Sequence, residues 1–441
     1  MKLAKSLLLG SAAGLVAVTG AQAADLPVRA AAPVDYVRTC PNAPIGGTGF
    51  FVIPGTETCL QISGYVRAEY RFEENVDVID AGGASSQYRD QDDIDFFARG
   101  SIAFDARTAT EYGTLRSFIR INGDEGDTED AYLDQGFIQF AGLTAGRITS
   151  FFSFFGGNLL TVSNGFSDPS TEVLAYTATF GSGFSATISV ENAKDRRSGI
   201  YASTVGAGLT GATNIYGGQE LPDLVANLNV SQAWGSAQVM AAIHQVRHND
   251  GSAAAAQIDD ELGWAVGAGV NIRLPMLAAG DALWLQAVYS EGAVSYADAP
   301  TTVGEFEVGL ADAYVNGTGT SLVLTEAWSI GGAFRHYWTP TFWQDLQAAY
   351  GEVDVPTTAN GLQAPGVVLA NTDADDYTWW QLGTRLNWRP VSGLTFSADV
   401  AYTSIDVDNP MQAYNNGAAV AGVVNNDGSR WAGRLRIQRD F

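Results

Sequence analysis

Few side chains of this 441-residue sequence could catalyse a reaction or hold a metal ion. The sequence has three histidines and two cysteines. His244 and His248 are four positions apart, and on a β-strand this spacing puts two side chains on one face but about 13 Å apart, too far to share a metal ion. The sequence contains no His-Glu-x-x-His, Gly-x-Ser-x-Gly or phosphate-binding Gly-Lys-Ser/Thr motif. We therefore expect no catalytic residue, no metal site and no cofactor.

Arginines and carboxylates offer a different chemistry, that of a charged passage for solutes. Arginines recur at polar positions of alternating segments, and antiparallel neighbours would bring them to similar height on one wall. A guanidinium stays charged and hydrogen-bonds through a fixed fork. Opposite charges facing each other across a channel would orient dipolar solutes and exclude apolar ones. The predicted eyelet has a basic wall of Arg67, Arg99, Arg116, Arg120 and Arg147 and an acidic loop with Asp168 and Glu172.

Pairing within the wall is the alternative use of these arginines. They could bind acids on the same wall, such as Glu69, and merely hold the wall together. The formal net charge is −24, and acidic connections would concentrate cations at the mouth, so we predict a weak cation preference. A chain this acidic is not expected to bind nucleic acid, because phosphate contacts need a basic face.

The elements that must position these charges are long alternating strands. Residues 60–72 place Ile62 and Val66 on one face and Arg67 and Glu69 on the other, over roughly 12 residues. This length suits a tilted membrane strand better than a globular one, for which 5–6 residues are typical. Similar segments give sixteen in all: 60–72, 94–106, 112–122, 131–141, 143–149, 172–181, 183–191, 222–234, 236–248, 261–274, 282–294, 322–338, 341–353, 377–389, 393–406 and 430–441.

The connections between these segments alternate in length. Eight are long and polar, and the intervening ones are short turns that mostly contain glycine or proline. Outer-membrane barrels have this asymmetry, with short periplasmic turns and long external loops. We therefore predict an all-β fold, a sixteen-stranded antiparallel transmembrane β-barrel over residues 59–441. The third long loop, residues 150–171, is apolar at first and is predicted to fold inward as the pore constriction.

Aromatic residues mark the expected membrane boundaries. Trp380 and Trp388 lie on one face with Leu382 and Leu386 between them, about 26 Å apart along a strand. Tilted at about 40°, this gives about 20 Å of height, close to the apolar band that aromatic girdles flank.

The N-terminal segment predicts export. Residues 1–23 combine a short basic start, an apolar run and Ala21-x-Ala23, the pattern of a cleaved secretory signal peptide of the general secretory pathway. Residues 24–58 are expected to form a periplasmic segment. In the oxidising periplasm Cys40 and Cys59 are expected to form one disulfide, since two thiols are too few for a structural zinc site.

The sequence from Cys40 to Arg67 closely resembles the opening of the alphaproteobacterial (rhizobial-type) outer-membrane porins. Residues 145–152, Ala-Gly-Arg-Ile-Thr-Ser-Phe-Phe, resemble that family's approach to its constriction loop, and the terminal Phe441 resembles the assembly signal of outer-membrane barrels. The resemblance implies a sixteen-stranded barrel, a homotrimer, and passive diffusion of small hydrophilic solutes. The expected partners are the lipid and lipopolysaccharide of the outer membrane and the barrel-assembly machinery.

Three other functions are weighed against a general diffusion porin. A substrate-selective channel for sugars or organic acids is the main one, because Trp379 and Tyr337 could line an aromatic track. An outer-membrane hydrolase would need a Ser or Asp beside a His at a strand end, and nothing specific points there. A soluble extracellular adhesin is the third, and the regular alternation of loop lengths disfavours it.

Overall fold

Alternation of apolar and polar residues produces the main architecture. The structure, a computed structural model, describes residues 38–40, 48–74, 94–125, 131–157, 159–160, 162–202, 214–249, 258–303, 306–307, 310–316, 320–356, 376–415 and 418–441. In strand β2 (Cys59–Glu73), Val66 is 60% exposed on the outer face, whereas Glu69 is 4% exposed on the inner face. The inner faces of the strands are therefore polar and the outer faces apolar, the reverse of a soluble protein.

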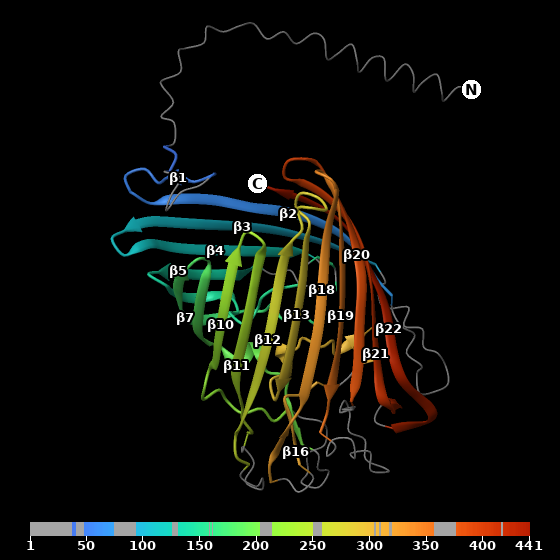
Figure 1. Ribbon diagram of the computed structural model, residues 1–441. Helices are drawn as coiled ribbons and strands as arrows, with labels where there is room; N and C mark the ends of the chain where they lie inside the picture. The colour runs from blue at the N-terminus through green and yellow to red at the C-terminus, as the bar shows by residue number, and fades with distance from the viewer. Residues whose placement is uncertain are drawn as a thin grey trace, which may run out of the picture. The chain divides into compact units, whose positions relative to one another are not determined.

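Sixteen long strands form one closed antiparallel barrel in the part of the chain that the structure describes (Figure 1). Each pairs with the next, and β2 also pairs with the last strand, from Tyr65 opposite Asp440 to Glu73 opposite Ala432, which closes the barrel. The strands are β2, β3 (Ile94–Thr110), β4 (Gly113–Glu125), β5 (Ala131–Phe140), β6 (Leu143–Thr149), β7 (Ser170–Gly181), β8 (Phe184–Glu191), β10 (Asp223–Gln232), β11 (Gly235–Val246), β12 (Glu261–Arg273), β13 (Ala282–Glu291), β18 (Glu326–Thr339), β19 (Phe342–Asp354), β20 (Tyr377–Val391), β21 (Leu394–Asn415) and β22 (Ala418–Asp440).

The sixteen predicted strands are confirmed, and the largest difference lies at the C-terminal hairpin. Residues 407–429 were expected to be a loop, but β21 and β22 continue to Asn415 and from Ala418. Strands β21 and β22 stay paired through their backbones beyond the apolar part of the barrel, with register shifts after Asp406. The sequence alone predicts a loop there, because hydrogen-bonded strands outside the membrane need no alternation of apolar and polar side chains.

Short additional elements lie outside the barrel wall. Strand β1 pairs with the start of β2, and the others belong to the long loops. These elements are β1 (Phe51–Val52), β9 (Ile200–Ala202), β14 (Thr302–Val303), β15 (Phe306–Glu307), β16 (Ala313–Val315), β17 (Leu322–Leu324) and the 3₁₀ helices η1 (Ala193–Arg196) and η2 (Val294–Tyr296). Among the described residues, no helix combines the length and apolarity that a membrane-spanning helix requires.

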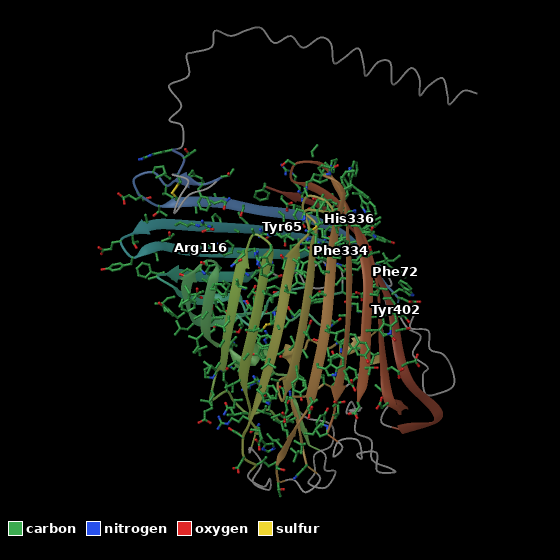
Figure 2. The ribbon with its side chains drawn as sticks, in the orientation of Figure 1. Tyr65, Phe72, Arg116, Phe334, His336 and Tyr402 are labelled. Atoms are coloured by element: carbon green, nitrogen blue, oxygen red, sulfur yellow. A yellow bond between two sulfur atoms is a disulfide. The ribbon has the colours of Figure 1, made fainter. Side chains whose placement is uncertain are left out.

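A band of aromatic side chains runs along the outer face at the long-loop end. Neighbouring rings lie 4.9 to 5.5 Å apart where they touch. Trp380 and Trp388 both lie on the outer face with Leu382 and Leu386 between them, as predicted. The band, which we call the girdle, continues over seven consecutive strands as Trp264, Tyr289, Trp328, Tyr350, Trp380, Tyr402 (labelled in Figure 2) and Trp431.

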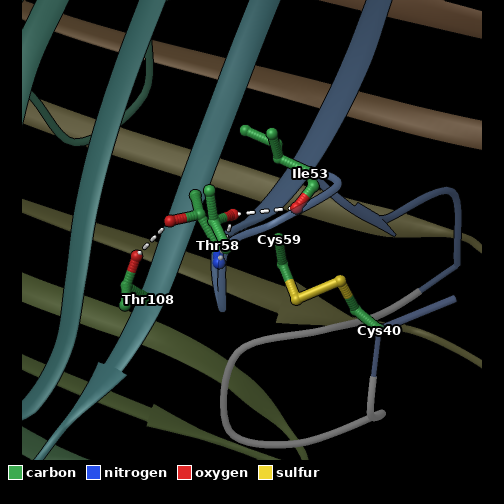
Figure 3. Close-up of a disulfide and its surroundings, with 6 residues drawn as sticks. Cys40, Ile53, Thr58, Cys59 and Thr108 are labelled. Atoms are coloured by element: carbon green, nitrogen blue, oxygen red, sulfur yellow. Dashed lines mark hydrogen bonds between the residues drawn. A yellow bond between two sulfur atoms is a disulfide. The ribbon is translucent and has the colours of Figure 1, made fainter. Parts of the chain in front are cut away.

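The predicted disulfide joins Cys40 to Cys59 (Figure 3). Both cysteines are buried with Phe50, and the hydroxyl of Thr58 contacts that of Thr108 on β3 at 2.9 Å. The disulfide therefore attaches the segment that precedes the barrel to the first residue of β2. The predicted signal peptide, residues 1–23, and most of the predicted periplasmic segment, 24–58, lie outside the described residues.

The third long loop, which we call loop 3 (residues 150–169, between β6 and β7), folds inside the barrel as predicted. Phe152 is fully buried and its ring lies 4.6 Å from that of Tyr296. Asn227 on β10 donates to the carbonyl of Phe151, and Gln238 on β11 donates to that of Ser153. Loop 3 is thus strapped to the inner wall by side chains of the strands that it crosses.

Glycines on the inner face make room for loop 3. A Cβ at Gly331 on β18 would overlap the ring of Phe166, and one at Gly383 on β20 would overlap Leu160. Phe155 stacks on Trp284 of β13 at 5.1 Å. Loop 3 therefore crosses the inner wall from β10 to β20, and its apolar side chains occupy the space that glycines of the wall leave free.

Candidate functional site

Four of the five predicted arginines, Arg67, Arg99, Arg116 and Arg120, lie on the inner face of neighbouring strands, and each has a polar partner on the same wall. Two bidentate pairs are the clearest: Arg99 donates to both oxygens of Asp124 at 2.6 Å, and Arg116 to both of Asp105 at 3.0 Å. The remaining pairs are Arg67 with Gln438 at 3.0 Å and Arg120 with Asp134. The alternative reading of these arginines, pairing within the wall, is thus the arrangement observed.

The register spreads these arginines along the wall. Arg67 lies opposite Arg99, and Arg99 lies opposite Asp124. Arg116 (labelled in Figure 2) lies opposite Arg107 instead, eight positions along β4 from Asp124 (124 − 116). Eight residues of strand span about 26 Å. The expectation of similar height is therefore wrong for Arg116, and the basic side chains form a ladder that runs along the pore.

Arg147 and Glu172 do not belong to the pore wall, contrary to the prediction. They lie opposite each other on β6 and β7, and Arg147 donates to Glu172 at 2.9 Å. Glu172 shares the outer face with Leu174 and Tyr176, which are 60% and 50% exposed. Strand alternation decides this, because the inward positions of β7 belong to the odd-numbered residues around Glu172.

A second cluster of arginines lines the seam where β22 meets β2, and the sequence reading missed it. The Glu69 carboxylate, whose side chain is 0% exposed, accepts hydrogen bonds from Arg71, Arg434 and Arg436. Asp399 accepts a hydrogen bond from Arg385 of β20 at 2.6 Å and another from Arg434 at 3.1 Å. The signal was present in the sequence, since these arginines alternate with the outward Trp431, Leu435 and Ile437.

An open cavity of about 680 Å³ lies where loop 3 approaches this seam. Loop 3 contributes Asp168, loop 4 (residues 192–222, between β8 and β10) contributes Arg196, and loop 6 (292–325, between β13 and β18) contributes Asp298. Glu73 of β2 and Arg430 of β22, paired at 3.0 Å, line the same cavity. Charges from three loops and the seam therefore meet in one place, and Asp168 is the predicted eyelet residue found there.

The two loop carboxylates are shifted toward neutrality. Desolvation by the surrounding protein raises the pKa of Asp168 to about 6, although the charge of Arg196 opposes the shift. Burial raises the pKa of Asp298 to about 6 as well, against the backbone N–H that Phe166 donates to it. The pKa of each carboxyl therefore lies above the usual range of an aspartate.

A buried network ties loops 4 and 6 to the wall. His244 of β11 contacts Asp223 at 2.7 Å through Nδ1 and the hydroxyl of Tyr216 at 2.8 Å through Nε2. Tyr296 donates to the other oxygen of Asp223 at 2.7 Å. The described residues contain no group of three or more His, Cys, Asp or Glu that could hold a metal ion. The histidine thus takes part in loop attachment.

These features together define a class of protein. An apolar outer face with an aromatic girdle fits a lipid bilayer, and a sixteen-stranded barrel is wide enough to leave an aqueous channel. Loop 3 lies inside the barrel, beside charged residues of the wall and of the other loops. The fold and the site are those of a channel-forming outer-membrane β-barrel.

The comparisons with known proteins identify the family. Residues 25–431 match the porin subfamily, and the chain belongs to it. Porin Omp2b of Brucella abortus (strain 2308) is 28% identical over 460 residues, 99% of both chains, and Omp2b of Brucella suis biovar 1 is equally similar. The outer-membrane channel DcaP of Acinetobacter baumannii shares the fold, with a TM-score of 0.60, 15% identity, and coverage of 88% of this chain and 99% of that chain. The protein is an outer-membrane porin, a channel for passive diffusion.

Proposed function

We propose that this porin is a general diffusion channel with a weak preference for cations. The carrying observation is the charge around the cavity between loop 3 and the seam. Two basic residues, Arg196 and Arg430, line it together with four acidic ones, Glu73, Asp168, Asp195 and Asp298. The excess of carboxylates would raise the local concentration of cations above that of anions.

In this proposal the arginine ladder forms the charged wall of the pore that faces loop 3. Arg99, Arg116 and Arg120 bind wall acids, and Arg67 binds the amide of Gln438. In this proposal the paired charges act as dipoles that orient polar solutes. Asp168 faces the cavity from loop 3. The proposed eyelet thus consists of paired wall charges on one side and loop carboxylates on the other.

Orientation and assembly belong to the same proposal. Residues 1–23 would direct export, residues 24–58 would remain in the periplasm, and the long loops would face outward among lipid and lipopolysaccharide. The backbone of Phe441 exchanges two hydrogen bonds with Gly64, at 3.0 and 3.1 Å, which completes the barrel seam. This position suits a terminal residue read by the assembly machinery when the barrel closes. We propose that the protein has no catalytic activity.

A homotrimer is proposed from the outer face. The girdle covers β12 to β22 but is not continued on the described outward positions at the long-loop ends of β6, β7 and β8. There the paired charges Arg147 and Glu172 face outward. Charges on a lipid-facing surface are unfavourable, so this sector suits contact with neighbouring copies better than lipid. Detergent-extracted trimers that separate into monomers only on heating would support it.

Liposome swelling distinguishes this proposal from a selective channel. Proteoliposomes would be diluted into isosmotic neutral sugars of increasing size. A general porin gives swelling rates that fall smoothly with molecular mass and do not saturate with concentration. Trp379 is fully buried beneath the loops and so does not offer an aromatic track for sugars. A rate that saturates for one solute class would favour the selective channel instead.

A further inference from the structure

Loops 4 and 6 meet at the mouth of the barrel, at its long-loop end. Strand β9 of loop 4 pairs in parallel with β16 of loop 6, with Ile200 opposite Ala313, and β16 also pairs with β17. Figure 1 shows β16 at the long-loop end. Tyr314 of loop 6 belongs to one buried cluster with Trp379 and Ile405, inward residues of β20 and β21. The two loops therefore lie against the inside of the wall and occupy part of the mouth.

One buried carboxylate joins both loops to the wall. Asp312 of loop 6 accepts the backbone N–H of Ser198 in loop 4 at 2.9 Å and that of Val294 at 3.2 Å. Its Oδ2 atom lies 3.8 Å from Nε2 of His244 on β11, whose Nδ1 contacts Asp223 of β10 at 2.7 Å. The side chains of Asp312, His244 and Asp223 are all 0% exposed. The imidazole thus lies between two buried carboxylates, one on the wall and one on a loop.

The charges of this cluster balance only when it binds a proton. Asp223 and Asp312 are negative and Arg197 of loop 4 is positive, so the formal sum around a neutral His244 is −1 (1 − 2). One proton brings this sum to zero. An uncompensated charge is costly to bury, so the attached loops favour the protonated cluster. The other titratable or charged groups around the cluster are Glu191, Arg196, Tyr216, His248 and Tyr296.

Asp312 gives the sign of the pH dependence. Desolvation raises the pKa of Asp312 to about 6, although the charge of His244 and the two backbone N–H donors oppose the shift. In detached, hydrated loops this carboxyl would have its usual pKa of about 3.9. The attached state therefore binds the proton more tightly. Attachment becomes stronger as pH falls through about 6 and weaker as pH rises.

From this geometry we propose that Asp312, His244 and Asp223 form a proton-dependent latch that fastens loops 4 and 6 to the barrel wall. One proton taken up from the medium holds both loops in place, and its loss lets them move at the mouth of the pore. Acid medium therefore steadies the mouth, and alkaline medium loosens it. The inference rests on the proposed diffusion function and goes beyond it, because the latch adds regulation to a passive channel.

Hydrogen exchange of the purified porin in detergent tests the latch without any substitution. Amide exchange would be followed by mass spectrometry at pH 5.5 and pH 8.5, with rates corrected for the intrinsic pH dependence of exchange. Peptides that contain β9 and β16 should be several-fold more protected at pH 5.5, whereas β18 and β19 near their short turn should change little. Equal protection at both pH values, or greater protection at pH 8.5, would overturn the proposal.

Variants assign the effect to the cluster. Asp312→Asn carries no charge at any pH, so the protection of β9 and β16 should lose its pH dependence. His336→Gln is the matched control, because His336 also contacts an aspartate, Asp281, at 2.6 Å but lies near the short turn of β18. His248→Gln removes the other buried histidine near loop 4 and should also keep the wild-type behaviour. Wild-type pH dependence in Asp312→Asn, or its loss in either control, would contradict the latch.

Single-channel recordings in KCl connect the latch to the pore. Brief closures of the wild-type channel should be several-fold more frequent at pH 8.5 than at pH 5.5 when the pH is changed on the long-loop side. A closure frequency that does not depend on pH would show that the latch does not regulate the channel. The absence of channels at every pH would instead contradict the diffusion function, so the two failures are distinguishable.

Discussion

Asp168 and Asp298 are the residues through which the pore should respond to pH. With a pKa of about 6, both are ionised above that pH and neutral below it. Their charge therefore favours cations at pH 7.5, and this contribution disappears as pH falls toward 4.5. We predict that the reversal potential in a KCl gradient moves toward zero over this range.

Substitution at the same residues should reproduce the effect of acid. Asp168→Asn or Asp298→Asn is expected to lower the cation preference at pH 7.5 and to reduce its dependence on pH. Glu220→Gln serves as control, because Glu220 pairs with Arg247 and does not line the cavity. Wild-type selectivity in both aspartate variants would show that other charges control the pore.

Glu69 is the residue on which the barrel seam depends most. Its buried carboxylate receives three arginines, and Arg67 lies 3.7 Å away. Glu69→Gln would remove the counter-charge of Arg436 and leave Arg434 only its share of Asp399, and breaking a buried ion pair costs about 3–5 kcal/mol. We predict a clearly lower urea midpoint for unfolding. Glu73→Gln, with a side chain that is 48% exposed, should change the midpoint little.

The sequence reading was least reliable for single residues. Alternation placed Arg99 and Arg116 on the inner wall, but their partners depended on a register that composition does not contain. Arg147 and Glu172 were assigned to the pore because they flank loop 3, yet strand parity turns them outward. Arg196 was missed since it lies in a loop, where no periodicity shows which way a side chain faces.

At the scale of elements, loop 3 and the glycines beneath it form a matched pair. Gly331→Ala would add a Cβ in the place of the Phe166 ring, and a rigid ring cannot yield without moving the loop. We predict that loop 3 shifts toward the lumen and that single-channel conductance falls. Gly332→Ala is the control, because that Cβ points outward toward the flexible end of Leu285. Equal conductance of both variants would mean that loop 3 does not narrow the pore.

The strands themselves could be predicted because the membrane imposes a period of two on both faces. Ile62 and Val66 must face lipid while Arg67 and Glu69 face water, so the polar positions of each strand predict its inner face. The inward fold of residues 150–171 was also foreseeable from Phe151 and Phe152. The course of loop 3 was not, because it depends on inner-wall glycines far away in sequence, such as Gly331 and Gly383.

At the scale of the whole molecule, the disulfide and the barrel should be separable. Cys40 and Cys59 close a loop of 19 residues outside the lumen. Such a cross-link contributes about 3 kcal/mol to the segment that it constrains. We predict that Cys40→Ser together with Cys59→Ser leaves conductance unchanged but makes residues before β2 sensitive to protease. Loss of channel activity in this variant would show that the segment is needed for the pore.

The central claim is that the barrel encloses a water-filled passage narrowed by loop 3. Conductance of the purified protein in planar bilayers, measured over a range of KCl concentrations and with a salt gradient, tests it most directly. Our account predicts stepwise channels whose conductance rises nearly in proportion to salt, with a reversal potential that shows a weak cation preference at neutral pH. The absence of channels, or a conductance that saturates at low salt, would contradict it.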